Sequence, residues 1–243
     1  MKFRRTNVLV VGGEGFIGKN LRSIYKPKIR WHNLDLKSKQ DVLDGIHKKY
    51  DAIVWLACNF TESEAGYKDN LEMFHALDNY MMMHLRTHII YTSSAAVYKD
   101  VPYSSKETDA LLPTTFYGKG KMFGEKFVNH CPRHTILRLS NVYGLGGRGV
   151  IDLFKAGKNE IHGDGNQVRD FVFVDDVCNT IVDAIENPRK WRGTFNVGVG
   201  FGLSVNTVFK MFGQGKPEHI KDAPTGVRCS VLDNCRWERQ WSQ

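Results

Sequence analysis

Tyr117 and Lys121 stand four residues apart in a stretch that we predict to be helical, so their side chains share one helix face. An ammonium group beside a phenol favours the phenolate and lowers the pKa of the tyrosine from its reference value of ~10. Ser94, at the end of a predicted strand, could hydrogen-bond the same substrate oxygen as this phenol. Among nine tyrosines one such pair is expected by chance. The pair is more informative here because it follows a glycine-rich turn and the predicted strand that ends at Ser94. In this order the three features predict acid-base chemistry near neutral pH.

A glycine-rich turn follows the first apolar run of the chain, in the sequence VLVVGGEGFIG at residues 8–18. We predict a strand, a tight turn at Gly12, Gly15 and Gly18, and a helix whose first N–H groups face an anion. Glu14 is unfavourable beside a pyrophosphate, so we expect its side chain to point to solvent. A glycine triplet alone is a weak signal, because many turns between a strand and a helix use one. Its place after the first strand favours dinucleotide binding over a purely structural turn.

Strands and helices alternate along the first part of the chain. The apolar run AIVWLA has the length and character of a buried parallel strand. The predicted elements are helix 15–25, strand 29–36, helix 38–49, strand 52–57, helix 68–86, strand 88–92, helix 114–129 and strand 135–139. This alternation predicts an α/β fold with a Rossmann-type, doubly wound parallel sheet.

The texture of the sequence changes after Tyr143, where we expect a second, smaller lobe to begin. The predicted elements are a short helix at 150–156, a turn at 163–165, a strand at 171–174, a helix capped by Asp175 or Asp176 that ends at Glu186, and a last helix at 205–212 capped by Ser204. We therefore predict a dinucleotide-binding domain at residues 1–143, to which 171–197 returns. A shortened substrate-binding lobe is expected at 144–243.

The composition indicates an ordinary globular protein of 243 residues, of which 42% are hydrophobic. Its net charge of +8 is dispersed, with no run of five or six like charges, so no nucleic-acid patch is indicated. No apolar run approaches the ~20 residues of a membrane helix, and residues 1–7 are too polar for a secretion signal, so we expect a cytoplasmic protein. The five cysteines form no C-x-x-C pair, which argues against a disulfide framework and a zinc site.

Five motifs resemble those of the extended short-chain dehydrogenase/reductase family, and within it those of the NAD-dependent nucleotide-sugar epimerases and dehydratases. GGEGFIG is similar to G-x-x-G-x-x-G, TSSAAVY to S-S-x-x-V-Y-G, and PTTFYGKGK to P-x-x-x-Y-G-x-S-K. LRLSNVYG is similar to L-R-x-x-N-V-Y-G, and GDGNQVRDFVFVDDV to G-D-G-x-Q-x-R-D-F-x-x-V-x-D-V. The motifs follow the order of the family and extend over residues 8–232.

The resemblance implies a catalytic set in which Tyr117 is the acid/base, Lys121 holds the nicotinamide ribose and tunes Tyr117, and Ser94 binds the reacting sugar hydroxyl. The positions that it assigns to the cofactor NAD are Gly12, Gly15, Phe16, Ile17 and Gly18 at the pyrophosphate, Asp35 and Leu36 at the adenine, Leu56 and Ala57 in the cofactor channel, and Tyr117 and Lys121. The positions that it assigns to a nucleotide-sugar substrate are Ser94, Asn141, Arg169 and Arg228. Simpler alternatives are that Asn141 caps a turn and that Arg228 is a surface charge.

Ala95 and Ala96 distinguish between the reactions of this family. By resemblance, the 4,6-dehydratases place an Asp-Glu pair there to eliminate water and the decarboxylases place a glutamate, whereas alanine does neither. We therefore expect an epimerase that oxidises a sugar carbon, lets the keto intermediate rotate and returns the hydride to the other face. The alternatives are a 4-keto-sugar reductase that consumes NADPH and a non-catalytic dinucleotide-binding protein. The resemblance also implies a homodimer that pairs through the helices at 68–86 and 114–129.

The region of the second strand departs from the family pattern, because WHNLDLKS merges two strands that are normally separate. Asp35 lies about twenty residues after Gly15, the distance expected of a ribose-binding acid, yet by resemblance it fits the adenine-contacting position. His32 or Asn33 would then take the ribose-binding place. Two lysines follow closely, so NADP stays an alternative to NAD.

Overall fold

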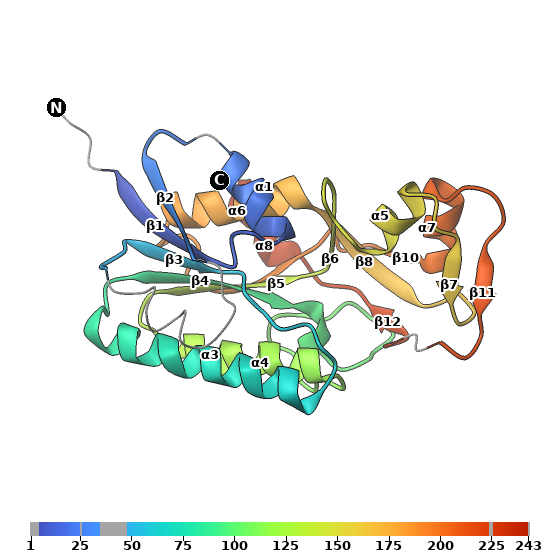
Figure 1. Cartoon of the computed structure of the whole chain (residues 1–243), viewed down its shortest axis with the longest axis horizontal. Helices are drawn as coiled ribbons and strands as arrows, with labels where there is room; N and C mark the ends of the chain where they lie inside the picture. Colours follow the sequence, from blue (N-terminus) through green and yellow to red (C-terminus); the bar gives the residue numbers. More distant parts are fainter. Residues whose placement is uncertain (1–4, 25, 35–47, 224–225, 243) are drawn as a thin grey trace.

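A parallel sheet of six strands forms the centre of the protein (Figure 1). The computed structural model describes residues 5–24, 26–34, 48–223 and 226–242. The strands of the sheet, in spatial order, are β2 (Ile29–Leu34), β1 (Thr6–Val11), β3 (Ala52–Trp55), β4 (His88–Ser94), β5 (His134–Leu139) and β9 (Gly193–Val197). After β2 the chain crosses back over β1, so β3 and the later strands lie on the other side of β1. This reversal of strand order is typical of doubly wound sheets, and the predicted α/β class is confirmed.

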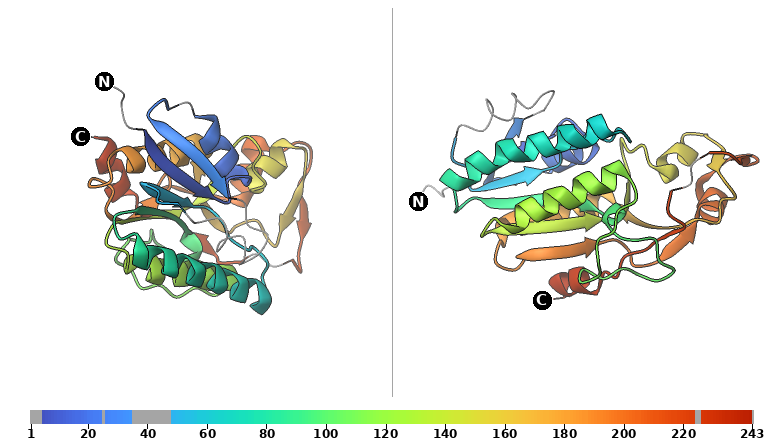
Figure 2. Two further views of the ribbon diagram at one scale, coloured as in Figure 1. Left: turned by 60° about the vertical axis from the view of Figure 1, so that its left-hand side comes forward. Right: turned by 90° about the horizontal axis from the view of Figure 1, so that it is seen from below.

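Helices cover both faces of the sheet (Figures 1 and 2). One face carries α3 (Glu64–Met83) and α4 (Phe116–Asn129), and the other carries α1 (Phe16–Ser23) and α6 (Val174–Glu186). Successive side chains of β1 point to opposite faces, so Leu9 packs beneath the first helix pair and Val10 beneath the second. Because both faces are buried, the inner strands are continuously apolar, as the sequence indicated.

Side-chain caps set the starts of the two helices on the first face. Ser63 Oγ accepts the N–H of Gly66, so α3 begins four residues earlier than the predicted helix at 68–86 and ends at Met83. Thr115 Oγ1 likewise accepts the N–H of Gly118 at 3.0 Å and fixes the first turn of α4. The predicted helix at 114–129 is therefore correct to within two residues.

The start of α6 differs from the prediction. The N-cap is Phe173, and no side chain caps this helix. Asp175 and Asp176 lie inside the first turn, where their carboxylates stabilise the positive end of the helix dipole. The prediction that one of them is the cap was wrong, because β8 (Val168–Phe173) runs directly into the helix.

Other element ends follow from local hydrogen bonds. The strand expected at 52–57 ends at Trp55, because the N–H groups of Leu56 and Ala57 both turn to the carbonyl of Val11, at 2.9 and 3.1 Å. The strand expected at 29–36 is described to Leu34, and most of the helix expected at 38–49 lies outside the described residues. Among the described residues, no helix combines the length and apolar character that a membrane crossing requires.

A smaller group of elements extends beyond the carboxyl edge of the central sheet (Figures 1 and 2). It consists of a sheet of β10 (Gly202–Ser204), β8, β12 (Cys229–Ser230) and β6 (Asn141–Tyr143), a pair of β7 (Glu160–His162) and β11 (Glu218–Ile220), and the helices α5 (Val150–Lys155) and α7 (Val205–Phe212). These helices share an apolar cluster in which Phe154 meets Phe209 edge to face. Ser204 caps α7 as predicted, and the division of the chain into two domains stays a prediction.

A further helix, α8 (Cys235–Trp241), follows α7, so the prediction that the helix at 205–212 is the last one was wrong. The sequence CRWERQW did not indicate this helix, since three of its seven residues are charged and none is buried. Trp237 anchors α8, because its indole N–H donates to Thr180 Oγ1 of α6 at 2.9 Å. The chain thus returns to the central sheet at its end.

A buried ion pair joins α4 to the centre of the sheet. Arg138 of β5 donates from two nitrogens to the two carboxylate oxygens of Glu125, at 2.9 and 2.7 Å. Ser93 of β4 donates to the same carboxylate, and Arg138 also donates to the hydroxyl of Tyr98 at 2.6 Å. The side chains of Glu125 and Arg138 are 1% and 6% exposed, so neither charge has water as an alternative partner.

We predict that Arg138→Met lowers the free energy of unfolding by about 3–5 kcal/mol, because the carboxylate of Glu125 would stay buried without its counter-charge. Urea denaturation followed by tryptophan fluorescence measures this loss. The double variant with Glu125→Leu should recover at least half of it. Lys68→Met, which breaks the exposed pair of Lys68 with Glu64, is the control and should change little. Equal stability of Arg138→Met and the wild type would contradict the prediction.

Candidate functional site

The glycine-rich turn between β1 and α1 has the backbone that a dinucleotide pyrophosphate needs. Gly12 has a φ of +84°, and a Cβ on it would lie 2.8 Å from the backbone nitrogen of Ala57. A Cβ on Gly18 would lie 2.5 Å from Cα of Gly13, so α1 can approach its strand only with glycine there. Gly15 is the N-cap of α1 and supplies no side-chain bond, which leaves the first N–H groups of the helix for an anion.

The other positions assigned to the cofactor gather around this turn as far as the structure describes them. Phe16 and Ile17 occupy the first turn of α1 and are half-buried. Leu56 and Ala57 leave β3 beside Val11, the last residue of β1. These residues fit a dinucleotide that runs along the carboxyl edge of the sheet. Asp35 and Leu36 lie outside the described residues.

Ser94, Tyr117 and Lys121 come together at the same edge, two strands away from the turn. Ser94 ends β4, and Tyr117 and Lys121 stand on successive turns of α4. The ammonium of Lys121 donates to the carbonyl of Thr92 at 2.8 Å and lies 5.8 Å from the ring centroid of Tyr117. Burial raises the pKa of Tyr117, and the nearby Ser94 hydroxyl opposes that rise. The spacing in the sequence thus predicted which side chains meet.

A close approach of backbones makes this meeting possible. Ser94 caps the short 3-10 helix η1 (Ala95–Val97), and its hydroxyl accepts the N–H of Ala96 at 3.2 Å. Gly118 of α4 packs against the carbonyl of Ala96, where any Cβ would overlap it. The glycine after Tyr117 therefore allows the phenol to lie over the end of β4.

The electrostatics of Tyr117 differ from the expectation. Burial raises the pKa of the phenol above its usual value, and this effect outweighs the hydrogen bond with Ser94. Burial also lowers the pKa of Lys121, opposed by the nearby Cys58 and Glu125. The prediction that the pKa of the phenol is lowered was wrong, because burial raises it and the Lys121 ammonium donates to the Thr92 carbonyl.

Two residues of the loop after β3 complete the surroundings of Tyr117, and the sequence analysis missed both. The ring of Phe60 stacks on the ring of Tyr117, with centroids 5.3 Å apart and planes 21° from parallel. The carboxylate of Glu62 accepts the N–H groups of Phe116 and Tyr117 at 2.9 and 3.3 Å. No spacing rule links these residues, because the contact spans more than fifty positions of the chain.

Besides Ser94, the residues assigned to the nucleotide sugar are Asn141, Arg169 and Arg228, which lie on or directly beside strands of the smaller sheet. Asn141 begins β6 and donates to the carbonyl of Asp170 at 2.9 Å. Arg169 lies on β8, where burial lowers the pKa of its guanidinium. Arg228 directly precedes β12, which pairs with β8 and so brings the two arginines to one end of the sheet.

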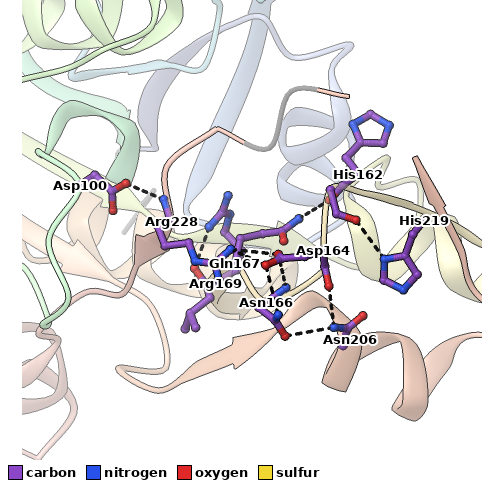
Figure 3. Close-up of polar contacts among 11 residues, drawn as sticks. Asp100, His162, Asp164, Asn166, Gln167, Arg169, Asn206, His219 and Arg228 are labelled. Carbon is purple, nitrogen blue, oxygen red and sulfur yellow. Dashed lines mark hydrogen bonds and ion pairs between the residues drawn. The ribbon is translucent and has the colours of Figure 1, made fainter. Parts of the chain in front are cut away.

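Arg228 is engaged by two aspartates (Figure 3). Its guanidinium donates to both oxygens of Asp164 at 2.9 and 3.0 Å, which holds the pKa of that carboxyl at about 2. Its backbone N–H donates to Asp100 at 2.6 Å, and the N–H of Cys229 donates to the same carboxylate. The side chain is 62% exposed, so the structure shows a paired surface arginine that a phosphate could reach.

Comparisons with known proteins agree with this geometry. Residues 8–198 match the model of the NAD dependent epimerase/dehydratase family. A putative UDP-glucose 4-epimerase of Methanocaldococcus jannaschii is 29% identical, over 83% of this chain and 80% of its own. A dTDP-4-dehydro-6-deoxyglucose reductase of Escherichia coli is 25% identical, over 86% and 82%.

Solved structures share the fold. The UDP-N-acetylglucosamine 4-epimerase of Methanobrevibacter ruminantium superposes with a TM-score of 0.83 at 22% identity, over 98% of this chain and 92% of its own. The resemblance noted in the motifs thus extends to the arrangement of the whole described structure. On the evidence of the family match across most of its length, the chain belongs to the NAD dependent epimerase/dehydratase family.

Proposed function

We propose that this chain is an NAD-dependent epimerase that acts on a nucleotide-diphosphate sugar through a transient keto intermediate, as UDP-glucose 4-epimerases do. The observation that carries the proposal is the group of Ser94, Tyr117 and Lys121 at the sheet edge that also holds the glycine turn. Ala95 and Ala96 follow Ser94 in η1, so no carboxylate stands there to eliminate water. The relative from Methanocaldococcus jannaschii supports the same reaction type.

Each of the three side chains has a defined part in this reaction. Tyr117 accepts the proton of the sugar hydroxyl when the carbon is oxidised and returns it when the carbonyl is reduced. Ser94 hydrogen-bonds the same oxygen and orients it toward the phenol. Lys121 places a positive charge beneath the site and is held in position by the Thr92 carbonyl. A bound nicotinamide supplies the reversible hydride acceptor for such a cycle.

The raised pKa of Tyr117 has a consequence for this proposal. Burial favours the protonated phenol, because a phenolate is solvated less well there than in water. A positive charge close to the phenol oxygen would oppose this effect and favour the phenolate, and Lys121, whose Nζ lies 5.8 Å from the ring centroid, is the cation on the same helix face.

A 4-keto-sugar reductase that consumes NADPH is the second candidate, and the relative from Escherichia coli favours it. Both reactions use the same serine, tyrosine and lysine, because each moves a hydride and a proton at one sugar carbon. They differ in whether the cofactor is regenerated. A non-catalytic dinucleotide-binding protein is less well supported, since all three side chains are present and lie at one edge of the sheet.

We predict that the wild-type protein inverts a sugar carbon in one of a panel of UDP-, GDP-, dTDP- and CDP-sugars while the cofactor absorbance stays constant. NMR follows the sugar and absorbance follows the cofactor in the same reaction. Tyr117→Phe should lower turnover by ~10²–10⁴-fold, because general acid-base catalysis contributes that much. Its folding and cofactor binding should persist, since the ring keeps its shape.

Tyr103→Phe is the matched control, because Tyr103 is 61% exposed and lies outside the catalytic group. Loss of NADPH in proportion to product would assign the reductase reaction instead. Equal turnover of Tyr117→Phe and the wild type would remove Tyr117 from the mechanism.

We propose further that Arg169 binds the diphosphate of the sugar nucleotide, because a guanidinium makes two charge-assisted hydrogen bonds to such a group. Arg169→Ala should weaken sugar-nucleotide binding about 10- to 100-fold in calorimetry and leave NAD binding unchanged. Arg86→Ala, at an exposed arginine beyond the end of α3, is the control. Unaltered affinity for both ligands would give Arg169 a structural part only.

We also propose a homodimer that pairs through α3 and α4. These helices lie side by side on one face (Figure 2), where the half-buried Phe123 and Phe127 both contact the exposed His75. Light scattering should give about twice the chain mass of 27.7 kDa. Phe123→Glu should give the mass of one chain, because it introduces a charge into the proposed interface. A wild-type mass of 27.7 kDa would refute the pairing.

A further inference from the structure

A carboxylate from the glycine turn stands at the end of β2. Oε1 of Glu14 accepts hydrogen bonds from Nδ2 of Asn33 at 2.9 Å and from a guanidinium nitrogen of Arg22 at 2.6 Å. The side chain is 46% exposed, in agreement with the expectation that it faces solvent, and these two hydrogen bonds fix its position. Within the described part of the chain, both of its bonds fall on Oε1, so Oε2 still has its full capacity to accept hydrogen bonds.

Asn33 fixes the place of this carboxylate relative to the turn. A Cβ on Gly13 would overlap Oδ1 of Asn33, so the amide packs directly on the glycine turn. His32 points elsewhere, since its ring meets Tyr50 edge to face. Of the two residues considered for the ribose-binding place, Asn33 is therefore the one that reaches the turn.

The end of β2 beside the glycine turn is where the ribose of a bound dinucleotide lies, and an acid about twenty residues after the turn usually binds its hydroxyl groups. The described end of β2 contributes an amide and no acid. We infer that Glu14 replaces that acid. Its carboxylate accepts the ribose hydroxyl groups of NAD, with Asn33 as its support, and repels the 2′-phosphate of NADP.

Arg22 makes the selection of NAD over NADP depend on the charge of Glu14. An arginine at this place would otherwise attract a 2′-phosphate. The ion pair with Glu14 neutralises it, and its Nε is buried without a partner among the described residues, so the guanidinium has bonding capacity left. Removal of the Glu14 charge would therefore both weaken the hold on the ribose and release a cation for the phosphate.

The inference rests on the dinucleotide-binding part of the proposed function and needs no sugar substrate for its test. The experiment is isothermal titration of NAD and of NADP into protein freed of copurified nucleotide. Glu14→Gln should weaken NAD binding about tenfold and strengthen NADP binding about tenfold, because a charge-assisted bond is lost and a repulsion removed. The ratio of the two dissociation constants should thus shift about a hundredfold.

Glu64→Gln is the matched control, since Glu64 is also an exposed glutamate paired with a basic residue, Lys68. It should leave both dissociation constants unchanged. The double variant of Glu14→Gln with Arg22→Ala should lose the gain in NADP affinity but keep the loss in NAD affinity. Thermal unfolding of each ligand-free variant shows that the fold is intact.

An unchanged ratio in Glu14→Gln would overturn the inference. A loss of the preference for NAD over NADP in Asp35→Asn but not in Glu14→Gln would also overturn the inference. It would assign the selection between the two nucleotides to Asp35. Wild-type protein that binds neither nucleotide would instead overturn the proposed function, which separates the two failures.

Discussion

The active-site geometry depends on one set of contacts between a strand and a helix. Two consecutive residues of β4 bond to residues that stand one turn apart on α4: the Thr92 carbonyl accepts from Lys121, and Ser93 donates to Glu125. Ser94, the next residue of β4, lies near Tyr117, one turn before Lys121. Glu125, the last of these α4 residues along the helix, forms the buried ion pair with Arg138 and so joins the contacts to β5. The residues proposed for catalysis and the residues that hold α4 on the sheet therefore share one interface.

Small residues on α4 are the second requirement of this interface. Gly118 lies against η1, and Gly124 lies against the rings of Phe74 and Tyr91, where a Cβ would come within 2.5 Å of both. Glycine in the middle of a helix costs about 1 kcal/mol relative to alanine, so its repeated use needs a reason in the packing. Close contact of α4 with α3 on one side and with the end of β4 on the other supplies that reason.

The sequence predicted elements whose signals are local, and it missed features that depend on distant residues. Continuous apolar runs predicted the central strands, and Ser204 predicted the start of α7. Both signals are local, because strand burial and helix capping depend on residues that are close together in the sequence. Spacing on one helix predicted that Tyr117 and Lys121 meet. Their pKa shifts could not be predicted, since they arise chiefly from burial in the folded chain. The partner of Arg228, Asp164, lies 64 positions away and no motif links the two.

The same polar contacts that fix the catalytic helix continue into the smaller sheet. Arg138 donates to the hydroxyl of Tyr98, which donates to Asn196 at 2.7 Å, and Asn196 donates to the carbonyls of Ser105 and Asp233. The segment before Asp233 carries β12 and, just ahead of it, the arginine assigned to the nucleotide sugar. Because buried polar groups must stay paired, this chain of bonds allows few alternative positions for that segment. The end of the candidate site that carries Arg228 is thus held in register with the end that carries Tyr117 by buried side chains that belong to neither end.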